Sequence, residues 1–294
     1  MAQVSIALRR WWPVWLLLFI GVLFWWERAT LKQWIGRAER RLFAYLGDQG
    51  PLQQVKPQPW EELQPGLWSR TLLMKRRRAW WTFRVKVLRM DPKQIRFRLW
   101  VGKPSRIRKV MQKTGALAAI NSGVFDTKLR PLGLFIHKGK VRNHRLHRRR
   151  IDGVFFVRKN KPGLAKGKGF KARGASLAFQ SAPLLVLKSK RLKLPKKRWS
   201  WQIDRRSALC IDKRGHLVWL ATDTFVNGLS YTELGLLMQQ SEKAWGLGCK
   251  WGLNLDGGAS TQMAYRAYGR LKRVVGLEKV PVFLLAEPVR KRKH

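Results

Sequence analysis

Length, composition and charge limit what this chain can be. The 294 residues are 45% hydrophobic, which suits one sizeable core with an appendage. Lys and Arg total 62 against 16 Asp and Glu, a formal charge of +46, so the protein must attract polyanions such as phosphorylated glycans, anionic lipid or nucleic acid. The sequence contains no zinc-finger spacing, basic zipper or RNP motif, so the common nucleic-acid readers are excluded and no specific nucleic-acid partner is expected.

An uncharged run near the N-terminus predicts a membrane anchor. Residues 11–26 lie between Arg10 and Glu27, and the Trp pairs at both ends of the run suit the two membrane interfaces. At about 1.5 Å per residue the run is somewhat short for a hydrocarbon core of about 30 Å. Since no small-residue cleavage site follows it, we expect residues 1–26 to form an uncleaved signal anchor that spans the membrane once.

The next stretch predicts a helix and then a linker. Residues 27–46 continue with apolar members at helical spacing. Pro51, Pro57, Pro59 and Pro65 are typical of a linker. We therefore expect a membrane-proximal segment over residues 27–66 and one folded domain over residues 67–294.

The first part of this domain predicts a hairpin, a helix and a buried strand. Residues 81–90 and 95–101 alternate apolar and basic side chains around a turn that contains Pro92. A helix is expected to start with Ser105 as its N-cap and to end at Gly115. The apolar residues 117–120 then predict a strand that delivers the next polar residues to its end.

The second part predicts another hairpin and a capped helix. Residues 206–212 and 216–221 are apolar runs on either side of a short basic turn. Ser230 and Glu233 have capping-box spacing, which explains the Glu233 carboxylate as part of a helix start. That helix is expected to stop near residues 246–248.

Two pairs of residues are candidates for metal or redox chemistry. Cys210 and Cys249 lie on or beside predicted core strands, so two buried thiols are the expected state, with a disulfide only if the domain lies outside the cytoplasm. His144 and His147 lie in a run of cations that would repel a metal ion, and no third ligand is arranged nearby. No cofactor or metal site is predicted, and the spacing does not support a divalent cation.

The most informative pattern lies at residues 250–263. Leu253 and Leu255 alternate with Asn254 and Asp256, which predicts a strand that ends on a carboxylate. Two glycines that allow close backbone approach and two hydroxyl side chains follow it: Gly257, Gly258, Ser260 and Thr261. A plain turn is the alternative, because Asp-Gly is a common hairpin signal.

Segments spread over the domain match one family in the family's own order. They are Asn121-Gly123-Phe125, Pro131-Gly133, Gln180-Ser181, Arg206-Ser207-Ala208 and Asn254-Asp256-Gly257-Gly258. In this pattern the chain resembles the phosphodiester glycosidase family over residues 83–285, although Ala182 and Asp152 depart from it. The resemblance implies an α+β fold with a twisted, mixed or mostly antiparallel sheet and packed helices. It also implies an enzyme that hydrolyses glycosyl phosphodiesters.

The resemblance also assigns roles to individual residues. Asp256 would be the acid/base or nucleophile, with its pKa expected to be lowered by neutral-to-cationic surroundings. Asn121 would orient the substrate, and Arg206 would stabilise charge on the phosphate. The implied substrate-binding residues are Gly123, Gln180, Ser181, Gly257, Gly258, Ser260 and Thr261. A phosphate leaving group is already acidic, so one carboxylate could suffice.

Location and substrate complete the hypothesis. The resemblance favours a bacterial inner-membrane protein whose C-terminal domain is periplasmic, whereas the excess of basic residues after residue 26 favours the cytoplasm. The expected substrate is a phosphorylated glycan of the cell envelope or of exopolysaccharide. The alternatives are a non-enzymatic cationic protein that binds anionic glycan, polymer or lipid, and a nucleic-acid binder.

Overall fold

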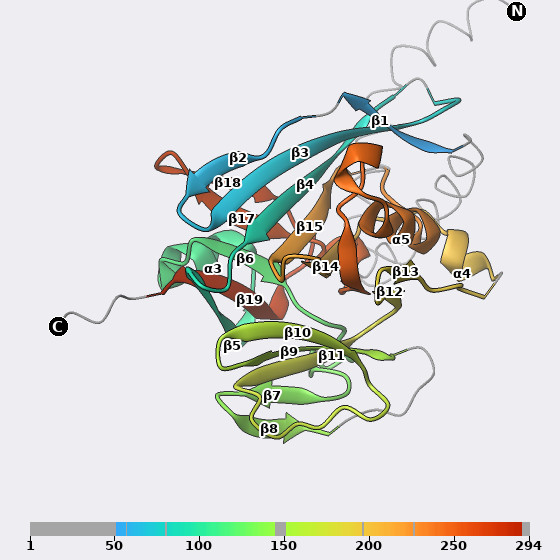
Figure 1. Ribbon diagram of the computed structural model, residues 1–294. Helices are drawn as coiled ribbons and strands as arrows, with labels where there is room; N and C mark the ends of the chain where they lie inside the picture. The colour runs from blue at the N-terminus through green and yellow to red at the C-terminus, as the bar shows by residue number, and fades with distance from the viewer. Residues whose placement is uncertain are drawn as a thin grey trace, which may run out of the picture.

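The computed structural model describes residues 51–56, 58–79, 81–144, 151–195, 197–225 and 227–289 (Figure 1). The expected membrane anchor and the helix after it lie outside these ranges. Within them, no helix has the length and apolar character needed to cross a membrane. The described chain is built mainly from antiparallel strands arranged in three sheets.

The largest sheet has nine strands. In spatial order its main path is β1 (Leu52–Lys56), β3 (Leu67–Arg76), β4 (Phe83–Met90), β15 (Leu217–Asp223), β14 (Ser207–Asp212), β16 (Cys249–Asn254), β12 (Leu184–Leu187) and β13 (Lys190–Arg191), with β2 (Glu61–Gln64) paired to β3. Its pairs are antiparallel. The sheet contains β14 and β16, the strands that carry Ser207 and Asn254 of the predicted motifs.

Two five-stranded sheets pack against this one. One runs β10 (Lys161–Lys166), β9 (Gly153–Arg158), β11 (Leu177–Ser181), β7 (Phe135–His137) and β8 (Lys140–Asn143), and lies at the bottom of Figure 1. The other runs β18 (Arg270–Val274), β17 (Met263–Ala267), β6 (Ala118–Asn121), β19 (Val280–Pro288) and β5 (Ile95–Ser105). β9 and β10 contact β16, so the lower sheet reaches the large one at that strand.

The helices are short and lie at the margins of the sheets. They are α3 (Ile107–Thr114), α4 (Arg198–Trp201) and α5 (Tyr231–Gln239), with 3-10 turns η1 (Glu242–Ala244) and η2 (Gly258–Ser260). α5 packs on β12 and β16 (Figure 1). Its capping box is present as predicted, with Ser230 accepting from the Glu233 N–H, but the helix ends at Gln239, before the predicted stop.

One hydrophobic core joins the three sheets. Its largest cluster includes Trp219 of β15, Phe155 of β9 and Leu284 of β19, all fully buried. Burying side chains of this size stabilises the fold by about 1.5–3 kcal/mol each. A second cluster lies between the large sheet and α5 and includes Leu220 and Leu237. The three sheets therefore fold around one another as one domain.

The structure changes three local expectations. The antiparallel character is confirmed, but the strands form three sheets instead of one. The expected linker contains β1 and β2, which pair with β3, and Leu52 is buried. Ser105 ends β5 and does not cap α3; the first residue of that helix, Ile107, instead donates its N–H to Gln262 Oε1 over 2.8 Å. A cap supplied from a distant strand cannot be read from local sequence.

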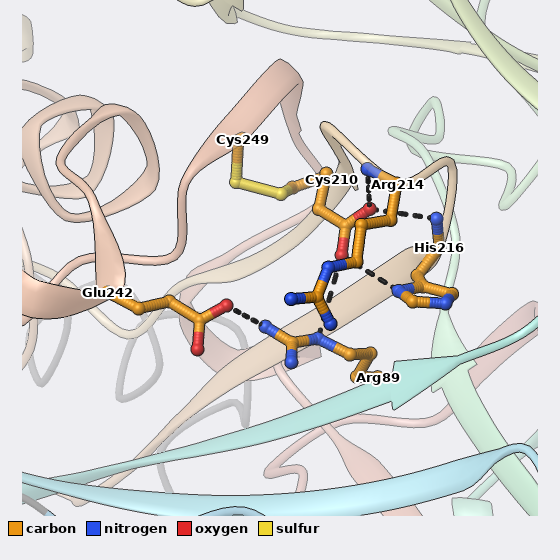
Figure 2. The surroundings of a disulfide bond; sticks show 7 residues. Arg89, Cys210, Arg214, His216, Glu242 and Cys249 are labelled. Carbon is orange, nitrogen blue, oxygen red and sulfur yellow. Dashed lines mark hydrogen bonds and ion pairs between the residues drawn. A yellow bond between two sulfur atoms is a disulfide. The ribbon is translucent and has the colours of Figure 1, made fainter.

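Cys210 and Cys249 form a disulfide between neighbouring strands, so the expectation of two free thiols is wrong. Their Cα atoms are 5.7 Å apart, a usual separation for the bond. Figure 2 shows charged groups near the disulfide, among them Arg89 and Glu242. Asp212 accepts a bond from the backbone N–H of His216 over 2.9 Å and faces Arg89 at 3.6 Å. The disulfide joins β14 to β16, and the Arg89–Asp212 ion pair joins β4 to β14, at the end of β16 opposite to Asp256.

Candidate active site

Asp256 lies just beyond β16, at the start of the turn into η2. Leu253 and Leu255 are fully buried, as the alternation predicts, and they fix this end of the strand in the core. The Leu255 N–H donates to the carbonyl of Ser207 over 2.8 Å, and the Asp256 N–H donates to the carbonyl of Ser122 over 3.1 Å. The carboxylate is thus attached to backbone that is held from two neighbouring segments.

Asn121 connects these segments through its side chain. It ends β6 and is fully buried. Its amide donates to the carbonyl of Asp256 over 2.8 Å, while its oxygen accepts from the Ser207 hydroxyl over 2.7 Å and from the Gln262 N–H over 3.1 Å. Three of the five predicted segments therefore meet here, those of Asn121, Ser207 and Asp256, and Asn121 acts by positioning the Asp256 turn.

Burial raises the pKa of Asp256 to about 6, opposite to the expected lowering. Hydrogen bonds from the Ser260 hydroxyl and the Gly257 N–H favour the carboxylate, but Glu278 and Asp204 add negative charge nearby. The many cations of this chain do not reverse the shift, because removal from water is the largest cause. Near neutral pH the group can therefore both accept and give up a proton.

Arg206 is buried beneath this turn and is partly committed to the fold. Its Nε donates to the carbonyl of Leu229 over 2.9 Å, one terminal nitrogen donates to the carbonyl of Gln202 over 2.8 Å, and the guanidinium lies 3.8 Å from the ring centre of Tyr231. The other terminal nitrogen, Nη1, has no partner among the described residues and lies 3.5 Å from the position of a Cβ at Gly257. Arg206 can therefore offer one terminal nitrogen toward the turn, and it cannot make a bidentate contact through two nitrogens.

Of the other residues expected to bind phosphate from this turn, Gly258 and Ser260 have hydrogen-bond partners within the fold. The Gly258 N–H donates to the carbonyl of Arg205 over 2.8 Å, and Gly258 has a positive φ of 59° that favours glycine. Ser260 donates to Asp256. Thr261 is fully buried, and its hydroxyl oxygen has no hydrogen-bond partner among the described residues. Phosphate binding by this turn stays a prediction.

Gly123, Gln180 and Ser181 form a separate group on β11 and the segments packed on it. A Cβ at Gly123 would lie 2.3 Å from the carbonyl oxygen of Gln180, so only glycine fits this crossing. The Gln180 side chain accepts from the Leu134 N–H over 2.8 Å and donates to the carbonyl of Ile151 over 2.7 Å. Ser181 is fully buried. The observed bonds of Gln180 hold loops together, and no described contact joins this group to the Asp256 carboxylate.

Sequence reasoning missed two residues of this site. Asp204 is half-buried, accepts from the Arg205 N–H over 2.8 Å, and has a carboxylate oxygen 3.6 Å from the position of a Cβ at Gly258. Gln262 is fully buried and links the site to α3. The one available signal for Asp204 was the scarcity of acidic residues, because in such a sequence any Asp or Glu next to a motif is a candidate site residue.

Metal binding has no visible support in this region. The described residues contain no group of three His, Cys, Asp or Glu side chains arranged to hold an ion. The site instead combines a carboxyl group with raised pKa, a second carboxylate and one available guanidinium nitrogen. Groups of these types can carry out acid–base chemistry and can bind an anionic substrate group.

Comparisons with known proteins agree with this chemistry. The model of the phosphodiester glycosidase family matches residues 114–285. The chain belongs to that family, whose members are enzymes that cleave glycosyl phosphodiester bonds. A search of curated proteins finds no match.

Solved structures support the fold. The chain is similar to the zebrafish N-acetylglucosamine-1-phosphodiester alpha-N-acetylglucosaminidase catalytic domain auto-inhibited by its pro-peptide, with a TM-score of 0.56, 15% identity, and coverage of 81% of this chain and 87% of that one. It is also similar to a hypothetical protein from Synechocystis, with a TM-score of 0.53, 16% identity, and coverage of 80% and 64%. At these identities the likeness concerns the fold.

Proposed function

We propose that this protein is a membrane-anchored hydrolase that separates sugar from phosphate in an anionic glycan of the cell envelope or of exopolysaccharide. The observation that carries the proposal is Asp256, whose half-buried carboxyl group has a raised pKa and whose backbone carbonyl accepts a hydrogen bond from Asn121. Family membership supports the bond type. The strongly positive charge supports an anionic substrate.

The raised pKa favours Asp256 as the general base. A base with a pKa near the working pH transfers protons efficiently. Asp256 would take a proton from water as the water attacks the anomeric carbon, and the bond to the phosphate oxygen would break to release a phosphomonoester. Asp204 would supply the second carboxylate that glycoside cleavage ordinarily uses. The available nitrogen of Arg206 would neutralise charge on the departing phosphate.

The disulfide supports an extracytoplasmic domain. Disulfides persist in oxidising compartments and are rare in the cytoplasm. Cys210 and Cys249 are bonded here, which favours the periplasmic side of the membrane over the side indicated by the flanking charges. Alkylation of cell lysates that were quenched with acid tests this: protection of both cysteines until reduction is expected, and immediate modification of both would contradict it.

Turnover of defined substrates tests the reaction. The full chain in mild detergent is incubated with a panel of glycosyl 1-phosphodiesters, and released sugar and phosphomonoester are measured. Asp256→Asn should lower kcat by at least about a hundredfold, in the range of a lost acid–base group. Asp126→Asn, which alters a half-buried loop carboxylate bonded to Arg130, is the matched control. Equal turnover in the parent and Asp256→Asn would refute the assignment of the base.

A further inference from the structure

A second cavity lies where the lower sheet meets the large sheet. Its volume is about 610 Å³, and it lies between β9, β10 and the loop after β10 on one side and the β12–β16 margin on the other. The loop belongs to the Gly- and Lys-rich stretch of residues 159–174, for which the proposed hydrolysis gives no use. None of the residues assigned to the Asp256 site lines this cavity.

Aromatic rings line part of this cavity. Phe156 and Phe170 pack with their ring centres 5.0 Å apart, and Trp251 of β16 contributes a half-buried indole. Gly163 pairs with Phe156 across β9 and β10, and a Cβ there would lie 2.2 Å from the Phe156 ring. Because Gly163 has no side chain, the phenyl ring can lie across the neighbouring strand. Flat apolar faces of this kind accept the faces of planar or ring-shaped groups.

Cations surround these rings. Arg158 lies over Phe156 and Phe170, 4.7 and 5.2 Å from their ring centres, and donates to the carbonyl of Lys171. The remaining charged lining residues are Lys166, Lys168, Lys171 and Lys188, all exposed. No acidic residue is among the lining residues, and none of these lysines makes an ion pair with a described carboxylate. The positive potential of the cavity is therefore not cancelled locally.

The geometry points to an accessory site that holds a distant segment of an anionic glycan, with sugar rings against the aromatic faces and acidic groups at the lysines. This inference rests on the proposed function for its choice of a glycan. Trp251 and Asp256 are five residues apart on and just after β16, roughly 17 Å for extended chain. A polymer can span that length, whereas a single sugar phosphodiester cannot. The cavity would therefore select for polymeric substrates.

Charge reversal inside and outside the cavity tests this. Binding of a phosphorylated mannan oligosaccharide to the full chain in mild detergent is measured by calorimetry at about 0.15 M salt, where the Debye length is about 8 Å. The double variant Lys168→Glu/Lys171→Glu should weaken binding by about tenfold or more. The control Lys103→Glu/Lys109→Glu makes the same charge change on exposed residues that do not line the cavity, and should weaken binding by less than about threefold. Equal losses in both variants would overturn the site.

Further measurements keep the glycan assignment separate from charge and from catalysis. Trp251→Leu, checked for an unchanged melting temperature, should weaken phosphomannan binding by about fivefold; unchanged binding would refute the aromatic contribution. Tighter, cavity-dependent binding of an oligothymidylate of equal charge would overturn the glycan in favour of nucleic acid.

Turnover of a small glycosyl phosphodiester should stay within about twofold in the cavity variants. If the parent shows no such turnover, the proposed hydrolysis fails while the binding result stands.

Discussion

Replacing Asp256 with asparagine should make the protein more stable at high pH while it abolishes turnover. Burial raises the pKa of this carboxyl group from 3.8 to about 6, so the folded state holds the proton more tightly than the unfolded chain does. The folded state is therefore relatively favoured at low pH and loses this advantage as the pH rises through about 6. The Asp256→Asn variant has no charge to bury and should not show this loss.

The expected size follows from the two pKa values. The interval from 3.8 to about 6 corresponds to about 3 kcal/mol at pH 8, and to about 0.5 kcal/mol at pH 4, where the folded state is protonated and the unfolded state is only partly ionised. Asparagine replaces one acceptor oxygen by an NH2 group, so losing a bond from Ser260 or Gly257 to that oxygen would cost about 1 kcal/mol at any pH. The change in the variant's relative stability between the two pH values, about 2.5 kcal/mol, is thus the informative quantity.

Urea unfolding of the full chain in constant mild detergent, followed by far-UV circular dichroism near pH 4 and pH 8, measures this change. Asp126→Asn is the control because its sign is opposite: hydrogen bonds from the backbone and side chain of Arg130 lower the pKa of Asp126, so that carboxylate stabilises the fold at high pH and less so as the pH falls. A difference between parent and Asp256→Asn that is constant over this range, or that grows in favour of the parent at pH 8, would refute the raised pKa.

Three further changes follow from the contacts of the fold. Cys210→Ser should lower the free energy of unfolding by about 2–4 kcal/mol, as a lost disulfide over a 39-residue separation predicts, measured by urea unfolding with and without reductant. Arg76→Met should cost about 3–5 kcal/mol, because it leaves the largely buried Glu233 carboxylate without its ion-pair partner; a melting temperature equal to that of the parent would contradict this. Gly123→Ala should lower stability by at least about 1–3 kcal/mol, since its Cβ would meet the Gln180 carbonyl at 2.3 Å, and thermal melting gives the answer.

The fold could be predicted where the pattern is local. Alternation of apolar residues placed β14, β15 and β16, and the capping box placed the start of α5. The division into three sheets could not be predicted, because it depends on which strands pair across long sequence separations, such as β17 with β6 and β19 with β5. The strands in the expected linker were missed for the same reason, because Leu52 is buried only when β1 pairs with β3.

The order of the motifs identified residues that lie together in the fold, but it did not predict what each of their side chains contacts. Asn121, Ser207 and Asp256 meet through direct bonds, although more than a hundred residues separate Asn121 from Asp256. Yet the side chain of Asn121 makes its hydrogen bonds to backbone groups and to the Ser207 hydroxyl. Arg206 makes its hydrogen bonds to carbonyl oxygens of the fold. A motif shows which residue type occupies a position. Whether that residue has a catalytic or a positioning role depends on how many of its hydrogen-bonding groups already have partners within the fold.

The raised pKa of Asp256 gives this division of roles a physical reason. A carboxylate that must serve as a base near neutral pH has to be kept from the cations that would lower its pKa, which is a demanding condition in a chain with a formal charge of +46. Most of those cations are on the surface, where water screens them. The Arg206 guanidinium beneath the turn donates to two carbonyl oxygens and lies on the Tyr231 ring. In the proposed mechanism, Arg206 fixed in this way would face a bound phosphate with one nitrogen, while burial keeps the pKa of the Asp256 carboxyl group raised.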